Sequence, residues 1–140
     1  MPLLFPPDLL DVFLAEYERA SKDPLNYGPT PHVFQEMLHT SPSKLTVLVA
    51  ANRLGKSWAG MREVLWRATM THPYREPKPI NMVWSGFPSF AFFRETTGPH
   101  FFSLMPRDRL IQVSQIEFWA KVRRADCGEC TIFFKPYEQG

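Results

Sequence analysis

Apolar and polar residues alternate at helical spacing in the first part of the chain. A helix that begins at Pro7–Asp8 would have one apolar stripe, made of Leu9, Leu10, Phe13, Leu14 and Tyr17. This pattern predicts an amphipathic helix that docks on the core by its apolar stripe. A turn-rich connector follows over residues 21–31, and a second short helix is expected over 31–39. Residues 1–40 are therefore predicted to form a helical segment and connector.

The middle of the chain predicts a strand, a helix and a second strand. Residues 45–49 are nearly all apolar, which is typical of a strand buried on both faces of a parallel sheet. The helix that follows carries an i, i+3, i+4, i+7 face made of Met61, Val64, Leu65 and Ala68. Residues 80–85 favour the second strand. This order makes a βαβ unit, so the sheet is expected to be parallel around the loop before the helix.

The last third of the chain favours strands. Residues 88–94 indicate one more helix, which Gly98-Pro99 should end. From Arg109 onward the pattern is β-rich, and residues 116–122 and 131–135 predict a hairpin. Residues 41–140 are thus expected to form one domain, and the whole chain an α/β fold with a parallel sheet, N-terminal helices and a C-terminal β-hairpin.

Composition limits the class of protein. With 140 residues, of which 44% are hydrophobic and 21% charged, the chain is long enough for one domain with its own core. A net charge of +2 does not by itself indicate a nucleic-acid partner. No apolar run is long enough to span a bilayer, and the N-terminus lacks the basic start of a signal peptide. A cytoplasmic protein without a membrane partner is expected.

Two cysteines, Cys127 and Cys130, form a single C-G-E-C motif between two predicted strands. A zinc site would need a second pair of ligands, and a thioredoxin-like redox motif would sit at the start of a helix. We interpret the pair as two thiols beside a hairpin turn.

The junction at residues 50–57 carries the most specific chemistry. A strand end, a sharp turn and a helix start leave backbone N–H groups available to an anion at the positive end of the helix dipole. Lys56 can reach the β- and γ-phosphates of a nucleotide, and the Ser57 hydroxyl can enter the Mg²⁺ shell. Ala50 stands where the usual G-x-x-x-x-G-K-[ST] motif has its first glycine. A phosphate-binding loop is predicted, against the plainer alternative of a helix start on a basic loop.

Hydrolysis of a nucleotide needs further acidic groups, which normally follow an apolar strand, hold Mg²⁺ and orient the attacking water. The nearest candidate strand, 131–134, runs into Lys135, and neither Glu117 nor Glu138 follows such a strand. The sequence supports nucleotide binding and does not support hydrolysis by this chain alone.

The loop at residues 51–57 (ANRLGKS) resembles the G-N-R-x-G-K-[ST] loop of tailed-phage terminase large subunits, the ATP-driven motors that package DNA into procapsids. Further stretches similar to that family are 35–39 (QEMLH), 79–86 (PINMVWSG), Arg94-Glu95, 104–106 (LMP) and 132–140 (IFFKPYEQG), the last with Pro136 in place of serine. In the family the Walker B strand follows closely, whereas this sequence stops at Gly140. The resemblance therefore implies a partial P-loop NTPase fold, the first part of a terminase ATPase domain, from a truncated gene, a prophage remnant or an incomplete sequence.

The resemblance also implies ATP and Mg²⁺ as cofactors. By position, Lys56 would contact phosphate, Ser57 would contact Mg²⁺, and Arg53 would stabilise charge on the γ-phosphate as the candidate catalytic residue. Gln35 would contact adenine. The nucleotide-binding residues carried over are Gln35, Asn52, Arg53, Leu54, Gly55, Lys56 and Ser57. The family's partners are double-stranded DNA, the small terminase subunit and the portal, in the host cell cytoplasm.

Contact with double-stranded DNA is expected to be weak, non-specific and salt-sensitive, because packaging motors grip the phosphate backbone without reading sequence. Basic residues that could touch phosphates are Arg107, Arg109, Lys121, Arg123 and Arg124. Arg123 and Arg124, beside the predicted hairpin turn, are the favoured contacts, and the alternative is a solvated basic face.

Two other functions stay open at the level of the sequence. One is a small P-loop kinase or other NTPase, which would need an acid or lid arginines placed for phosphoryl transfer. The other is a non-enzymatic prophage remnant whose loop is only structural, which would not bind nucleotide. Because an unpaired sheet edge and exposed apolar surface favour aggregation, the isolated chain is expected to be poorly soluble or to depend on a partner.

Overall fold

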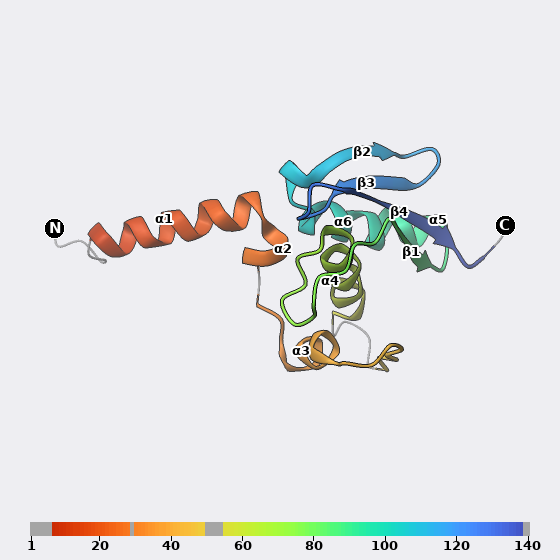
Figure 1. The fold of residues 1–140 in the computed structure, drawn as a ribbon, viewed down its shortest axis with the longest axis horizontal. Coiled ribbons are helices and arrows are strands. Elements are labelled where there is room, and N and C mark those ends of the chain that lie inside the picture. Colours follow the sequence, from red (N-terminus) through yellow and green to blue (C-terminus); the bar gives the residue numbers. More distant parts are fainter. Residues whose placement is uncertain (1–6, 29, 50–54, 139–140) are drawn as a thin grey trace.

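One sheet of four strands forms the body of the computed structural model, which describes residues 7–28, 30–49 and 55–138. The strands are β1 (Met82–Phe87), β2 (Leu110–Ser114), β3 (Trp119–Arg123) and β4 (Glu129–Pro136), in the spatial order β1-β4-β3-β2 (Figure 1). β1 and β4 are parallel, whereas β3 runs antiparallel to both of its neighbours. The fold is mixed α/β, and the expectation of a parallel sheet holds for one pair of strands only. Short turns join β2 to β3 and β3 to β4, and such turns can connect only antiparallel strands.

β3 and β4 form the predicted hairpin. β3 begins at Trp119, later than expected, because residues 115–118 make the turn from β2. Burial alternates along β4, where Cys130, Ile132 and Phe134 are buried and the residues between them are more exposed. One face of the sheet therefore belongs to the core and the other faces away from it.

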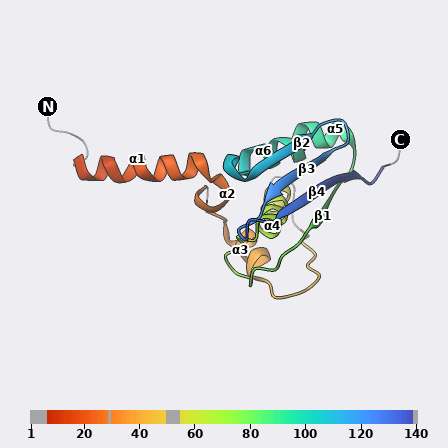
Figure 2. The same cartoon turned by 45° about the horizontal axis from the view of Figure 1, so that its top comes forward.

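Helix α4 (Lys56–Thr69) packs on the buried face of the sheet (Figure 2). Met61, Leu65 and Ala68 are all buried, and Val64 packs against the same core, as the helical period predicts. Helix α4 is thus held by the core, which positions its N-terminus.

A second covering segment begins as α5 (Phe90–Phe92), continues as a π-helix, η1 (Phe93–Thr97), and ends as α6 (Gly98–Leu104). The prediction that Gly98-Pro99 ends the helix is wrong, because Gly98 has helical φ and ψ of −61° and −52°. The wider π-turn lies directly before Pro99, where it accommodates the missing N–H and the bulk of the proline ring. A short 3-10 helix, η2 (Arg107–Arg109), leads into β2.

Three helices precede the body: α1 (Pro7–Lys22), α2 (Pro24–Tyr27) and α3 (Val33–Thr40). The two predicted helices are present, but α1 does not dock on the core and extends away from the body (Figures 1 and 2). Leu10, Leu14 and Tyr17 on its apolar stripe are 53%, 54% and 72% exposed. The chain is anchored instead through α2, whose Leu25 is fully buried, and α1 continues outward from it. None of the helices within the described ranges is long and apolar enough to cross a membrane.

Residues 45–49 are not a strand, contrary to the prediction. Leu45, Val47 and Val49 are 82%, 78% and 90% exposed, and the segment has no regular secondary structure. An apolar run becomes a strand only where a neighbouring strand supplies backbone hydrogen bonds and side-chain cover. The four described strands pair only with one another, so this segment lacks both.

Candidate functional site

The N-terminus of α4 is the centre of the candidate site. Gly55 caps the helix in the left-handed region, with φ of 74°, and Lys56 is the first helical residue. Glycine reaches this φ without the strain that a Cβ atom would cause. Ala50, Asn52, Arg53 and Leu54 lie outside the described residues, so the roles predicted for the last three stay predictions.

Gln35 lies directly beside Gly55. Its Nε2 donates to the carbonyl oxygen of Gly55 at 3.2 Å, and its Oε1 accepts from the backbone N–H of His32, also at 3.2 Å. Gln35 is 8% exposed. Its amide therefore links Gly55, at the start of α4, to the start of α3, and contact with adenine stays a prediction.

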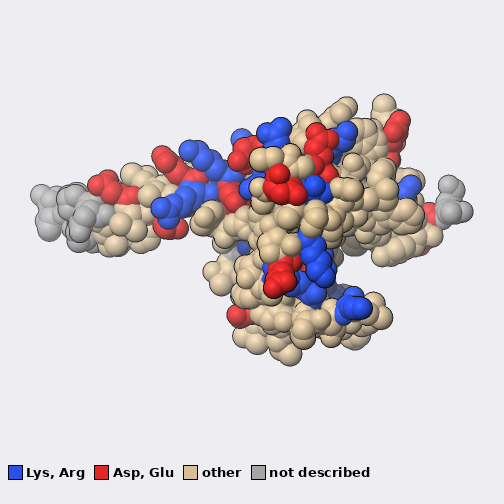
Figure 3. Space-filling model, viewed as in Figure 1, with Lys and Arg blue, Asp and Glu red and all other residues tan. Residues whose placement is uncertain are grey.

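A cavity of about 480 Å³ opens beside Lys56. One face of α4 lines it with Lys56, Gly60, Glu63 and Arg67, and the other lining residues are Leu38, 43–46, Leu48 and Arg75. Four cations, Lys44, Lys56, Arg67 and Arg75, share this lining with one carboxylate. Figure 3 shows Lys and Arg side chains gathered on the part of the body beside α3. Lys56 lies at the N-terminus of α4 and Arg67 in its last turn, so the positive charge extends along this face of the helix. An excess of cations in one cavity favours an anionic ligand.

Ser57 faces a different cavity, of about 280 Å³, between α4 and β1. The hydroxyls of Ser85 and Thr97 belong to the same lining, and the described lining residues include no carboxylate. Mg²⁺ usually takes only one or two protein oxygens and completes its shell with water and phosphate. Ser57 and Lys56 line different cavities, so contact of the Ser57 hydroxyl with Mg²⁺ stays a prediction. The described residues hold no group of three His, Cys, Asp or Glu suited to a metal ion.

Glu63 accepts hydrogen bonds from three other side chains. Its Oε1 lies 2.8 Å from Nδ1 of His39 and 2.9 Å from Nε2 of His72, and its Oε2 lies 3.1 Å from Nε of Arg67. Burial acts to raise the pKa of Glu63, but the hydrogen bonds from His39, His72 and Arg67 hold that pKa well below its usual range. The carboxylate is therefore ionised at neutral pH and joins α3, α4 and the segment after α4.

The hydrogen bonds also determine the tautomers of the two histidines. Nδ1 of His72 accepts from the backbone N–H of Tyr74 at 3.1 Å, so Nε2 carries the hydrogen donated to Glu63. His39 must donate to the same oxygen from Nδ1, because an ionised carboxylate only accepts. The Trp66 ring packs on both, with centroid distances of 4.7 Å to His39 and 5.1 Å to His72.

Sequence reasoning missed this cluster. Glu63 and Arg67 stand four residues apart on a predicted helix, a spacing that indicates an ion pair. His39 and His72 are separated from Glu63 by 24 and 9 residues, and no spacing rule connects them. The packing of α3 against α4 brings His39 to Glu63, and the path of the chain after α4 brings His72 to the same oxygen.

The two favoured DNA contacts lie in different environments. Arg123 is exposed on β3, whereas the side chain of Arg124 is only 11% exposed. The Arg124 guanidinium donates to the carboxylate of Asp126 at 2.9 Å, to the Asn81 side chain at 2.7 Å and to the carbonyl oxygen of Ile80 at 3.1 Å. The hydrogen bonds from Arg124 and from the Gly128 backbone lower the pKa of Asp126. Arg124 therefore braces the hairpin turn, and phosphate contact by either arginine stays a prediction.

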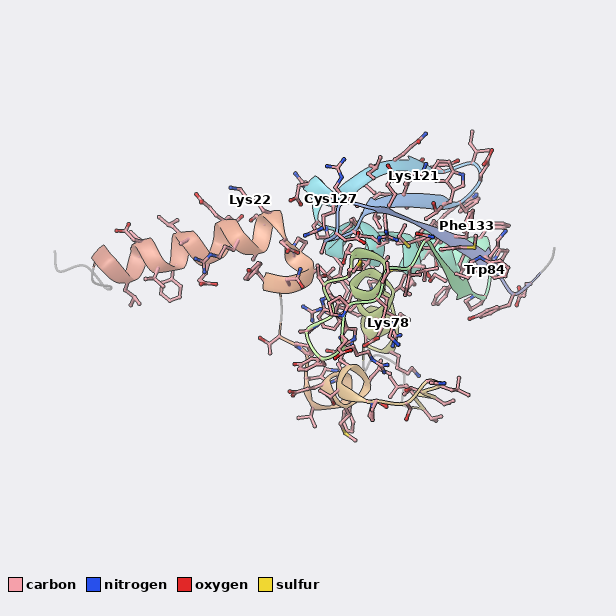
Figure 4. The ribbon with its side chains drawn as sticks, viewed as in Figure 1. Lys22, Lys78, Trp84, Lys121, Cys127 and Phe133 are labelled. Carbon is pink, nitrogen blue, oxygen red and sulfur yellow. The ribbon has the colours of Figure 1, made fainter. Side chains whose placement is uncertain are left out.

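The two thiols flank this turn, as the sequence predicts. Cys127 is exposed in the turn, with φ of 69°, and Cys130 is buried in β4 (Figure 4). Both are free, and burial raises the pKa of the Cys130 thiol. Neither cysteine begins a helix, so the geometry lacks the setting of a helix-borne redox motif.

A further cavity, of about 490 Å³, lies between α6 and the β2–β3 turn, and five phenylalanines contribute to its lining. It contains none of the residues predicted to contact nucleotide, Mg²⁺ or DNA. Of those residues, the structure brings Gln35, Gly55 and Lys56 together at one end of α4, with Ser57 turned toward the neighbouring cavity. Comparison of the chain with protein-family models, with curated proteins and with solved structures found no match.

Proposed function

We propose that this chain binds ATP with Mg²⁺ at the N-terminus of α4, as the N-terminal part of the ATPase domain of a terminase large subunit. The observation that carries the proposal is the cationic cavity beside Lys56, which lies where the G-K-S motif predicts phosphate. The resemblance of residues 51–57 and of the later stretches to terminase motifs supplies the family.

The chemistry of the cavity suits a triphosphate. Lys56 places a positive charge at the N-terminus of α4. The positive end of the helix dipole and the first backbone N–H groups attract an anion to the same place. Arg67 and Arg75 are held in place, since Arg67 donates to Glu63 at 3.1 Å and Arg75 donates to the carbonyl oxygens of Ser41 and Ser43. Pre-positioned guanidinium groups lose little conformational entropy when an anion binds.

We do not propose that this chain hydrolyses ATP by itself. The sequence contains no Walker B acid, and Glu63, the carboxylate of the cavity lining, already accepts from His39, His72 and Arg67. A low pKa makes this carboxylate a weak base toward an attacking water. Coupling to DNA packaging, with double-stranded DNA, the small subunit and the portal as partners, follows from the family resemblance alone.

Titration of Mg-ATP into the full chain, followed by calorimetry, tests the proposal. Lys56→Ala is expected to lower the affinity at least tenfold, because it removes the charge that contacts the β- and γ-phosphates. Lys22→Ala, at the exposed end of α1, is the matched control and should leave the affinity unchanged. Equal affinity of the wild-type and Lys56→Ala chains would contradict the phosphate-loop assignment. Absence of Mg-ATP binding would favour the non-enzymatic alternative over both nucleotide-binding functions.

A further inference from the structure

The face of the sheet opposite the core carries a row of aromatic side chains. Strand register places Trp84 of β1 beside Phe133 of β4, and Phe133 beside Trp119 of β3. Paired residues project from the same face of a sheet, about 5 Å apart. Trp84 is 69% exposed, although its strand is paired, and Phe133 is half-buried. Figure 4 labels Trp84 and Phe133 on these neighbouring strands.

Tyr137 extends this row through a close approach that only glycine allows. A Cβ atom on Gly86 would lie 2.4 Å from the Tyr137 ring, so the ring lies directly over the Gly86 backbone. Gly86 is two residues from Trp84 along β1 and therefore shares its face of the sheet. Tyr137 is 73% exposed. Three aromatic side chains from β1, β4 and the residue after β4, namely Trp84, Phe133 and Tyr137, thus form one exposed platform, called here the aromatic platform.

Basic side chains surround the aromatic platform on the same face. Lys121 and Arg123 of β3 and Lys135 of β4 alternate with the buried positions of their strands. The Lys135 ammonium lies 5.9 Å from the centroid of the Phe133 ring. Two carboxylates accompany them: Glu129 lies 3.9 Å from Lys121, and Glu117 accepts from the Trp119 indole at 2.9 Å. The cations thus outnumber the carboxylates on this face, next to flat, accessible rings.

We propose that this face binds single-stranded nucleic acid, with bases stacked on the aromatic platform and backbone phosphates at Lys121, Arg123 and Lys135. Sequence-tolerant binding of single strands uses this combination of aromatic rings for base stacking and cations for the backbone. A duplex keeps its base faces inside the stack and can offer the platform only its phosphates. A purely apolar protein segment would leave the excess positive charge of this face without a complementary charge, since Glu129 pairs with Lys121 alone among the three cations. Trp84 and Gly86 also line the cavity that Ser57 faces, so binding of single strands is measured without nucleotide or Mg²⁺.

Fluorescence anisotropy of the full chain with a labelled oligodeoxythymidylate of about twelve nucleotides tests it, without added nucleotide or Mg²⁺. Trp84→Ala and Phe133→Ala are each expected to weaken binding about tenfold, the scale of one lost stacking partner. Tyr17→Ala, on an exposed aromatic side chain of α1, is the control and should not change the affinity. Lys135→Ala should make the slope of log affinity against log salt shallower by about 0.7, whereas Lys22→Ala should leave the slope as it is.

Competition with unlabelled nucleic acids identifies the ligand of the aromatic platform. Unlabelled oligodeoxythymidylate or oligouridylate should displace the probe, and the stronger of the two shows whether DNA or RNA is preferred. Equal displacement by a DNA duplex of the same length would overturn the proposal, because charge alone would then explain binding. Unchanged affinity of Trp84→Ala would overturn it as well. Sedimentation that shows a dimer dissociated by Trp84→Ala, together with no oligonucleotide binding, would assign the face to a second copy of the chain instead.

Discussion

Nδ1 of His39 lies 2.8 Å from Oε1 of Glu63 and joins α3 to α4. The same oxygen accepts from Nε2 of His72 at 2.9 Å. His39 is fully buried and the Glu63 side chain is 14% exposed, so the contact is largely shielded from water. A single ionised carboxylate therefore holds one wall of the candidate site.

Replacing Glu63 with Gln should lower the free energy of unfolding by about 2 kcal/mol, because hydrogen bonds to a charged partner contribute more than neutral ones. Urea unfolding of the two chains measures the difference. Glu76→Gln, an exposed carboxyl in the loop after α4, is the matched control and should change stability by less than about 0.5 kcal/mol. Equal effects of the two substitutions would mean that the cluster adds nothing to stability.

The stability of the wild-type chain should fall in acid. The pKa of Glu63 is lower in the folded chain than its ordinary value of 4.5, so the unfolded chain takes up this proton first as pH decreases. The contribution of Glu63 is complete above pH 4.5 and is lost as pH falls below that value. Unfolding at several pH values should show the gap between the wild-type and Glu63→Gln chains narrowing in this range. A gap that stays constant would contradict the assignment.

Two glycines of the site region should respond in opposite directions to alanine. Gly55 has φ of 74°, and its new Cβ atom would lie 2.5 Å from Nε2 of Gln35, so Gly55→Ala should cost about 1–2 kcal/mol of stability. Gly60 lies inside α4 with no atom within 4 Å of the new Cβ position, so Gly60→Ala should stabilise by about 0.5–1 kcal/mol. Thermal or urea unfolding measures both changes. Stabilisation by Gly55→Ala would show that the loop does not need the left-handed conformation.

The apolar stripe of α1 should contribute little to the stability of the chain. Leu10 and Leu14 are each more than half exposed, so the double substitution to glutamine should shift the free energy of unfolding by less than about 1 kcal/mol. Leu25→Ala is the positive control, and its fully buried side chain should cost about 2–5 kcal/mol. A loss of similar size in the α1 variant would show that the stripe docks on the body in solution.

Local patterns predicted most of the secondary structure. The helical period of α1 and α4 and the strands of the hairpin depend on neighbours close in sequence, and these predictions are confirmed. Two predictions of secondary structure were wrong, the strand at residues 45–49 and the helix end at Gly98-Pro99. Both depend on structure beyond the local sequence pattern. A strand needs a partner that the apolar run itself cannot specify, and a π-turn before Pro99 lets a helix continue where proline normally ends it.

By itself, the sequence determined the helices α1 and α4, the core-facing side of α4, the C-terminal hairpin and the position of a G-K-S motif at a helix start, because each depends on residues close to one another in the chain. Only the tertiary structure decided that the sheet is mixed, that Gln35 supports Gly55, that two histidines share one oxygen of Glu63, and that aromatic rings from β1 and β4 meet on an open face. These relationships join residues far apart in the chain. Their physical cause is the pairing of strands and the packing of helices, which short-range periodicity does not encode.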